Sequence, residues 1–325
     1  MKPRRRAVRW AVSVLSVLLI VPRYAGNERL PEIGAEPRVT IVPYVPAQGW
    51  PERIGQLVPL AGYKLRSHDP AFGGFSAIAW RNGRAMLLSD GGNLVSFGLR
   101  DGQAIHPRGH VLPGGPAIGW DRADRDSESL ALDPVRGTAW VGFENQNEIW
   151  RHSPNFRRVE GHSAPGLMRN WVRNQGAEAL VRLKDGRFVA FAERKPGRRS
   201  RYAVLFSGDP TAPGTKAAPL RLVPPDRYDP SDAAVLPNGD LLILTRRFQY
   251  PFNFSAKLVR VPGAALRPGA HVRGEVIATL ASPIMGENCE GIAITQERGA
   301  TIVWIVTDND GMPWRPSYLL KFQLR

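Results

Sequence analysis

The chain has 325 residues, of which 43% are hydrophobic, enough to build a packed core in one large domain or two ordinary ones. Its 33 glycines and 29 prolines make long uninterrupted helices hard to place, while the composition stays short of the low-complexity range typical of disorder. The single cysteine excludes an intramolecular disulfide framework and a cysteine-rich zinc site.

The N-terminus carries much of the formal charge of +15. Basic residues at positions 2–9 precede an apolar run over residues 10–21, and no acidic residue occurs before Glu28. A basic segment followed by a short apolar stretch predicts a secretory signal, and hence export to the periplasm or beyond. The run is short for a membrane-spanning helix, which needs ~20 residues. Ala25 suits a cleavage site but Arg23 does not, so an uncleaved inner-membrane anchor through residues 10–21 is the alternative.

Residues 1–25 hold six cations and no acidic residue, so the rest of the chain carries +9. No basic stripe interleaved with aromatic residues and no nucleic-acid motif accompanies that charge, so we predict a solvated basic surface and no nucleic-acid partner. The predicted organisation is a signal or anchor at 1–25, a linker or extension at 26–54, and one domain at 55–325. We expect a monomer.

A hairpin pattern recurs five times along the chain. Each copy has a polar residue, a strand of alternating small and apolar residues, a tight turn, and a second apolar strand that ends in another polar residue. Asn-Gly and Asp-Gly between apolar strands are strong hairpin signals, because both residues adopt positive φ. The copies cover residues 76–90, 128–144, 178–193, 232–246 and 290–308, with turns at Asn82-Gly83, Arg136-Gly137, Asp185-Gly186, Asn238-Gly239 and Arg298-Gly299.

The copies begin about 50 to 58 residues apart, which predicts an all-β propeller with four short strands in each blade. An early strand at 55–66 is expected to complete the blade formed by the C-terminus and so close the ring. Five blades around a central channel are counted directly, and residues 30–60 or 209–226 leave room for a sixth. A β-sandwich is the alternative, but it gives no reason for the repeat. Outer strands are expected at 93–99, 148–152, 202–206, 256–261 and 318–324.

The polar residues that bound the five hairpins should gather at one mouth of the channel. In an antiparallel hairpin, the first residue of one strand and the last residue of the next lie at the same end. Eight of these ten residues are acidic, which predicts a concentrated negative site in a basic protein. The expected pairs are Ser76 with Asp90, Glu128 with Glu144, Glu178 with Glu193, Asp232 with Arg246, and Glu290 with Asp308.

Crowded carboxylates bind a cation, pair with basic groups, or keep protons through raised pKa values. Their hard oxygen atoms favour Ca²⁺ or Mg²⁺ over zinc, and we expect Ca²⁺. Glu128 and Glu178 are the candidates for proton transfer, and Arg246 is the candidate for holding a substrate anion. The alternative is that these polar residues only cap strand ends. The expected metal ligands are Asp90, Glu144, Glu193, Asp232, Glu290 and Asp308, with further oxygen donors at 307–311.

Other familiar site motifs are missing from the sequence. It has no H-E-x-x-H pair, no G-x-x-x-x-G-K-[ST] phosphate loop and no dinucleotide fingerprint. Cys289 lies beside Glu290, but no histidine partner is evident, so a packed small side chain is favoured over a nucleophile.

Over about residues 57–324 the sequence resembles the phytase-like (esterase-like activity of phytase) domain family, a group of bacterial, largely exported β-propellers. The first repeat departs from the acidic pattern with Ser76, and the fourth departs from the glutamate pattern with Asp232. The motifs that carry the resemblance are Phe75-Ser-Ala-Ile78, Leu88-Ser-Asp-Gly91, Asp126-Ser-Glu-Ser-Leu130, Gly142-Phe-Glu144, Asn174-Gln-Gly-Ala-Glu-Ala-Leu180, Ala192-Glu193, Asp232-Ala-Ala-Val-Leu-Pro-Asn-Gly239, Leu244-Thr-Arg-Arg-Phe248, Asn288-Cys-Glu-Gly-Ile-Ala293 and Thr307-Asp-Asn-Asp310.

The resemblance implies a hydrolase of phosphoesters or esters that uses a metal. Together with the acidic ring, it predicts an exported hydrolase that acts on an anionic or ester small molecule with a divalent cation. A lactonase-type propeller is the alternative among enzymes. A non-catalytic periplasmic or envelope-interaction propeller that uses the same mouth is the alternative from another class.

Overall fold

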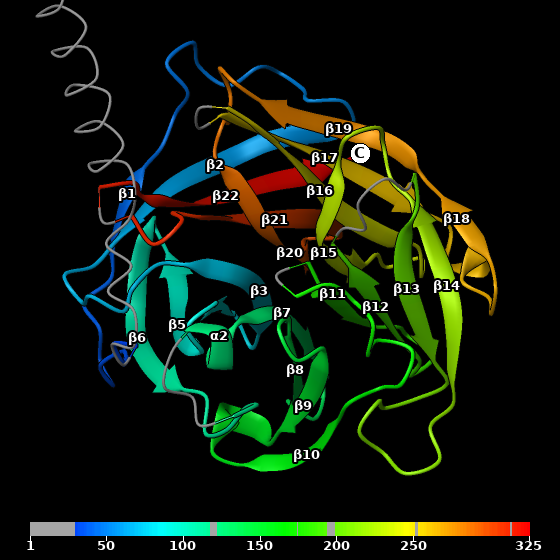
Figure 1. The fold of residues 1–325 in the computed structure, drawn as a ribbon. Coiled ribbons are helices and arrows are strands. Elements are labelled where there is room, and N and C mark those ends of the chain that lie inside the picture. Colours follow the sequence, from blue (N-terminus) through cyan, green and yellow to red (C-terminus); the bar gives the residue numbers. More distant parts are fainter. Residues whose placement is uncertain (1–29, 118–121, 174, 194–198, 251–252, 313) are drawn as a thin grey trace, which may run out of the picture.

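The computed structural model describes residues 30–117, 122–173, 175–193, 199–250, 253–312 and 314–325. They form an all-β propeller of five blades around a central axis, viewed along that axis in Figure 1. Within these described residues, helix is limited to α2 (Arg122–Arg125) and short 3-10 turns at Pro154–Phe156 and Gly263–Ala265. The predicted fold is therefore confirmed. The predicted signal or anchor lies outside the described residues, and within them no helix has the length and apolar character to cross a bilayer.

Each blade is an antiparallel sheet whose strands follow one another outward from the axis. The first blade contains β3 (Phe75–Arg81), β4 (Arg84–Ser89), β5 (Asn93–Arg100) and β6 (Gln103–Val111). The second contains β7 (Ser127–Leu132), β8 (Ala139–Phe143), β9 (Glu148–His152) and β10 (Val159–Ser163). The third contains β11 (Ala177–Arg182), β12 (Phe188–Ala192), β13 (Arg201–Phe206) and β14 (Ala217–Val223), with β18 (His271–Arg273) added in parallel at its edge.

The fourth blade contains β15 (Asp229–Val235), β16 (Leu241–Gln249), β17 (Asn253–Val261) and β19 (Glu275–Ala281). The fifth contains β20 (Asn288–Glu297), β21 (Ala300–Asp308), β22 (Ser317–Leu324), β2 (Leu57–Arg66) and β1 (Thr40–Pro43). The five predicted outer strands are thus present as β5, β9, β13, β17 and β22.

The ring closes in the fifth blade, as the sequence predicts. β2 pairs antiparallel with the C-terminal strand β22, from Leu57 opposite Leu324 to Leu65 opposite Ser317. β1 pairs with the outer side of β2, so this blade reaches upstream of residue 55. The two stretches with room for a sixth blade supply β1 and β14 to the fifth and third blades, so the count stays at five.

Small residues let the five innermost strands approach one another around the axis. β3, β7, β11, β15 and β20 contact their neighbours in a closed ring. At Gly291 in β20, an added Cβ would lie 2.8 Å from the backbone nitrogen of Ile78 in β3, closer than real Cβ contacts allow. Larger apolar residues farther out pack between blades, as where Leu244 and Leu258 meet Ile305 and Phe322.

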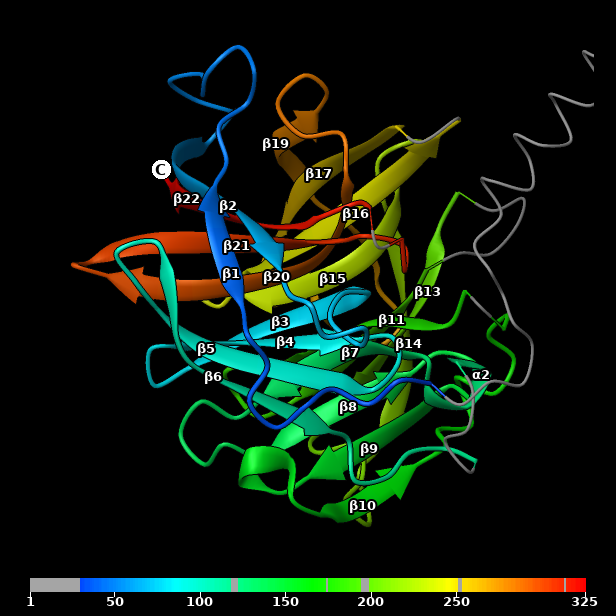
Figure 2. The same cartoon turned by 90° about the vertical axis from the view of Figure 1, so that its left-hand side faces the viewer.

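The tight turns that predicted the hairpins lie at the opposite ends of the innermost strands from the polar residues. Asn82-Gly83 and Arg298-Gly299 have positive φ at both residues, as a two-residue hairpin turn requires. In the side view of Figure 2, the β20–β21 turn lies at one end of the propeller, and the paired ends of β16 and β17, where Gln249 is opposite Asn253, lie at the other. The second end, where the bounding polar residues meet, is called the mouth below.

Candidate functional site

The innermost strand of every blade carries a β-bulge at the mouth. In each of these strands one residue has no cross-strand partner, while its two neighbours are paired. A bulge bends the strand and re-aims a side chain, which is why bulges recur next to active sites. The bulged residues are Ser76, Glu128, Glu178, Ser231 and Glu290.

The register corrects the alignment of the fourth repeat by one residue. Ser231, and not Asp232, occupies the bulge position that Glu128 and Glu178 occupy in other blades. Both Asp232 oxygens accept backbone N–H bonds of 2.8 Å, from Ala233 and from Ile292 in the fifth blade. Asp232 is buried, and its carboxylate joins the innermost strands of two blades.

The two serines at bulge positions have the same structural task. Ser76 Oγ donates to the backbone oxygen of Ser127 at 2.6 Å, and Ser231 Oγ donates to that of Cys289 at 3.1 Å. Each acceptor immediately precedes the bulged glutamate of another blade. A serine at the bulge therefore ties innermost strands together, and the bulged carboxylates of the mouth come from Glu128, Glu178 and Glu290.

Arg246 organises one half of the mouth. Its Nη1 lies 2.6 Å from Glu290 Oε1, and its Nη2 lies 3.0 Å from Glu193 Oε1 and 3.9 Å from Glu178 Oε1. Nη1 also donates to Asn288 Oδ1 at 3.1 Å. The structure thus brings the predicted anion-holding residue together with three predicted site residues. Its charge is already shared among three carboxylates of the protein.

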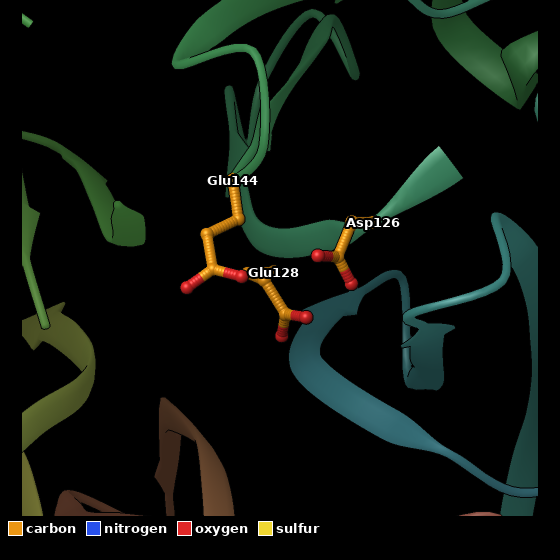
Figure 3. A group of neighbouring side chains, drawn as sticks. All are labelled: Asp126, Glu128 and Glu144. Atoms are coloured by element: carbon orange, nitrogen blue, oxygen red, sulfur yellow. The ribbon is translucent and has the colours of Figure 1, made fainter. Parts of the chain in front are cut away.

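The other half of the mouth holds a second group of carboxylates. Asp126, Glu128 and Glu144 each offer an oxygen within 4.8 Å of the others, and Glu144, Glu178 and Glu193 do the same. Figure 3 shows the first three side chains converging from β7, the segment before it and the residue after β8. Glu144 belongs to both groups. We call Asp126, Glu128 and Glu144 the first carboxylate triad, and Glu144, Glu178 and Glu193 the second.

A close backbone approach holds Glu144 in place. The backbone N–H of Gly176 donates to Glu144 Oε1 at 3.1 Å. An added Cβ at Gly176 would lie 2.2 Å from Asn147 Oδ1 and 2.6 Å from the backbone oxygen of Glu144, so only glycine fits there. On the other side of the first triad, Asn145 Nδ2 donates to Asp126 Oδ2 at 2.6 Å.

Burial and mutual repulsion make these carboxyl groups weak acids. Burial, and then the charge of Asp126, raise the pKa of Glu144 to about 8. The pKa of Glu128 lies well above its usual range because of burial and the nearby Asp126 and Glu144. Burial and Glu193 raise the pKa of Glu178, although Arg246 opposes the shift. Burial raises the pKa of Glu290 to about 7, again against the effect of Arg246.

Asp90 and Asp308 lie outside both triads, at the first and fifth blades. Asp308 Oδ1 accepts the backbone N–H of Asp310 at 2.9 Å. Burial raises the pKa of Asp308, and the charges of Asp90 and Asp310 add to the effect. Asp90 packs against the loop before β3, where a Cβ at Gly74 would lie 2.8 Å from Asp90 Oδ1.

The first triad fits a divalent cation by donor type and by distance. Ca²⁺ binds oxygen ligands at about 2.3–2.6 Å, so two ligand atoms of one ion are at most about 5 Å apart. The oxygens of Asp126, Glu128 and Glu144 lie within 4.8 Å of one another. Sequence reasoning placed Glu144 among the ligands and Glu128 in proton transfer, and it missed Asp126. The signal for Asp126 was its spacing of two from Glu128 at the start of an innermost strand.

Two other features do not compete with the mouth as a reactive site. A cleft of about 390 Å³ lies at the opposite end, and its lining residues include Trp80, Trp304 and Glu297. The Glu297 carboxylate there is ion-paired with Lys321 at 2.7 Å. Cys289 is buried, which raises the pKa of its thiol, and it packs in the core between the fourth and fifth blades. It is the packed side chain that the sequence favoured.

The chain belongs to the phytase-like family, because the family's sequence model, described as "Esterase-like activity of phytase", matches residues 70–311. A search of curated proteins gave no match. Among solved structures, the chain is similar to Myxococcus xanthus glutaminyl cyclase (11% identity, 90% of this chain and 100% of that chain, TM-score 0.46). It is also similar to the Malassezia sympodialis allergen Mala s 1 (12% identity, 84% and 91%, TM-score 0.46) and to a chain of a nidogen/laminin complex (10% identity, 86% and 93%, TM-score 0.43).

Proposed function

We propose that this member of the phytase-like family is an exported hydrolase that cleaves an ester or phosphoester at the mouth of its channel with the help of a bound Ca²⁺. The observation that carries the proposal is the pair of carboxylate triads, made of buried and half-buried side chains, that share Glu144. Strand capping alone needs no such convergence from separate blades. The family described by esterase-like activity supports the reaction class.

In this proposal the first triad holds the cation through Asp126, Glu128 and Glu144. A divalent cation bound there supplies a Lewis acid that polarises the carbonyl or phosphoryl oxygen of the substrate. With a cation there, Asp126, Glu128 and Glu144 would ionise together, which burial and repulsion otherwise oppose. Glu128 is therefore assigned to the cation, which leaves Glu178 as the proton carrier.

Glu178 has the position that a proton carrier needs. It belongs to the second triad beside Glu144, and its Oε1 lies 3.9 Å from Arg246 Nη2. Hydrolysis forms a bond from water oxygen to the acyl carbon or phosphorus and breaks the bond to the leaving oxygen. The water proton passes to the Glu178 carboxylate and from there to the leaving alcohol. Burial raises the pKa of Glu178 toward neutral pH, and a carboxyl group with such a pKa can both accept and return a proton.

The experiment that tests this proposal combines turnover with calcium binding. Purified protein is assayed on 4-nitrophenyl acetate and 4-nitrophenyl phosphate, with Ca²⁺ and with chelator, for wild type, Glu178→Gln and the control Glu275→Gln on the exposed surface of β19. We expect calcium-dependent turnover that falls at least 100-fold in Glu178→Gln, in line with the loss of a general acid–base group. Turnover of neither substrate in wild type, with or without Ca²⁺, would contradict the proposal.

A non-catalytic binding propeller is the second candidate, and the Arg246 cluster favours it. An arginine engaged by Glu178, Glu193 and Glu290 resembles an internal ion-pair network, which stabilises a fold without chemistry. Calcium binding without ester or phosphoester turnover would select this reading. Turnover of lactones with little turnover of open-chain esters would select a lactonase-type hydrolase.

A further inference from the structure

An aromatic rim borders the mouth on the side of the fourth and fifth blades. We define it by Phe248, Tyr250 and Trp314, whose exposed fractions are 55%, 90% and 66%. Within the described part of the chain, no other phenylalanine, tyrosine or tryptophan is classed as exposed. All such side chains are therefore gathered beside the candidate site, and none lies on the rest of the described surface.

Strand geometry places Phe248 next to Arg246. Successive side chains of a strand point to opposite faces, so residues 244, 246 and 248 of β16 share one face. Leu244 on that face packs with the fifth blade, and Arg246 contacts Glu290 of the same blade. Phe248 is one step farther along, about 7 Å beyond Arg246 and outside the ring of carboxylates. Its ring centroid lies 5.0 Å from that of Phe254, its partner on β17.

A second contact ties the loop that carries Trp314 to the same hairpin. The guanidinium carbon of Arg315 lies 6.0 Å from the Phe254 ring centroid. Arg315 also pairs with Asp310 and Glu287, beside the outer end of the carboxylate site. Asn288 connects these groups inward, because its Nδ2 donates to Asp310 Oδ1 at 3.0 Å and its Oδ1 accepts from Arg246. Phe248, through Phe254, and the loop of Trp314, through Arg315, are thus connected to the mouth, and Tyr250 directly follows the mouth end of β16.

The charge of the mouth opposes a substrate with several negative charges. Among the described residues of the mouth, Asp126, Glu128 and Glu144 form the first carboxylate triad, while Arg246 is already shared by Glu178, Glu193 and Glu290. One divalent cation leaves the site with an excess of carboxylates. Where these carboxyl groups are ionised they repel a polyanion more strongly than the same charges do in water, and where a raised pKa keeps them protonated they give it no attraction. A neutral ester escapes this repulsion, and apolar groups of such an ester gain by leaving water on an aromatic surface.

From the continuity of the rim with the mouth and from this charge balance, we propose that the substrate is an uncharged ester with a planar apolar group, which packs on Phe248, Tyr250 and Trp314 while the ester bond lies at the carboxylates. The inference rests on the proposed function for its reaction, and it narrows the substrate class from esters and phosphoesters to carboxylic esters of low charge.

Three matched probes test the substrate class in the presence of Ca²⁺: 2-naphthyl acetate, methyl acetate and 2-naphthyl phosphate. Binding of N-(2-naphthyl)acetamide, which resists hydrolysis, is measured by titration calorimetry as a readout that needs no turnover. The variants are Tyr250→Ala and the double variant Phe248→Ala/Tyr250→Ala. The control is Val135→Ala, which alters an equally exposed side chain (84%) at the turn end of the second hairpin.

We expect the double variant to lower kcat/KM for 2-naphthyl acetate and the affinity for the amide about tenfold, as the loss of aromatic stacking predicts. Methyl acetate turnover and the Val135→Ala protein should be unchanged. The naphthyl phosphate should be at least tenfold poorer than the naphthyl acetate. If the amide does not bind, or if the double variant loses turnover equally on both acetates, the aromatic rim does not bind the substrate. If the naphthyl phosphate reacts as fast as the naphthyl acetate, the substrate class is not limited to uncharged esters. If the amide binds to wild type more tightly than to the double variant but no ester is turned over, the rim is a binding surface and the proposed hydrolase function is wrong.

Discussion

Replacing Glu144 by glutamine should make the calcium-free protein more stable at alkaline pH. Burial and Asp126 raise the pKa of Glu144 from 4.5 to about 8. The folded protein therefore holds a proton that the unfolded chain has already released, and the unfolding free energy falls as pH rises from 4.5 to 8. This difference corresponds to about 5 kcal/mol, of which about 2 kcal/mol falls above pH 6.5. Glutamine does not ionise, and its amide oxygen can still accept the Gly176 N–H.

Urea unfolding in chelator at pH 6.5 and pH 9, followed by tryptophan fluorescence, measures this effect. At pH 9 the variant should exceed wild type by up to about 5 kcal/mol, with a smaller gain at pH 6.5. Glu275→Gln, an exposed change of the same kind, should match wild type. With Ca²⁺ present the advantage of the variant should shrink by about 2.7 kcal/mol at a hundredfold excess of calcium over the wild-type Kd, because wild type gains that stability and the variant does not. Equal pH dependence in wild type and Glu144→Gln would refute the reasoning.

Four further outcomes are expected. Ca²⁺ should raise the Tm of wild type, and Glu178→Gln should reduce that shift while keeping the fold; no shift in wild type would end the calcium assignment. Burial lowers the pKa of His152 to about 4. The free energy of unfolding should therefore fall by about 3 kcal/mol as the pH drops from 6.5 to 4. Unfolding curves of His152→Leu in acid should lack this pH dependence. Asp232→Ala should cost about 2–5 kcal/mol, because two buried N–H groups lose their acceptor, yet leave the calcium shift in place. A reporter fused to residues 1–30 should be exported across the inner membrane; retention would refute the predicted signal, and export without a change in size would favour the anchor.

The repeat was readable in the sequence because local chemistry imposes it. Asn82, Gly83 and Gly299 adopt the positive φ values that tight hairpin turns require, and asparagine and glycine adopt them readily on their own. Alternation of small and apolar residues marks a strand between two packed faces. Closure by an early strand, predicted at 55–66, was inferred because that strand precedes the first hairpin and could complete the C-terminal blade.

The acidic residues of the mouth were also readable, but their grouping was not. A hairpin register fixes which residues are neighbours within one blade, as for Glu128 and Glu144. Whether Glu144 meets Glu178 of the next blade depends on the angle between two sheets, which no local pattern encodes. The fourth blade shows the limit most clearly. A bulge adds one residue to a strand, so Ser231 takes the mouth position and Asp232 turns to the backbone of the fifth blade.

The sequence by itself determined the five hairpins, their ring and the presence of an acidic mouth, because turn residues and two-residue alternation act over a few neighbouring positions. Only the tertiary structure decided how the acidic residues of the mouth are grouped. Arg246 of the fourth blade reaches Glu193 of the third and Glu290 of the fifth, while Asp126, Glu128 and Glu144 form a separate triad. Distance and burial set the strength of these interactions, and both arise only when the blades pack around one axis.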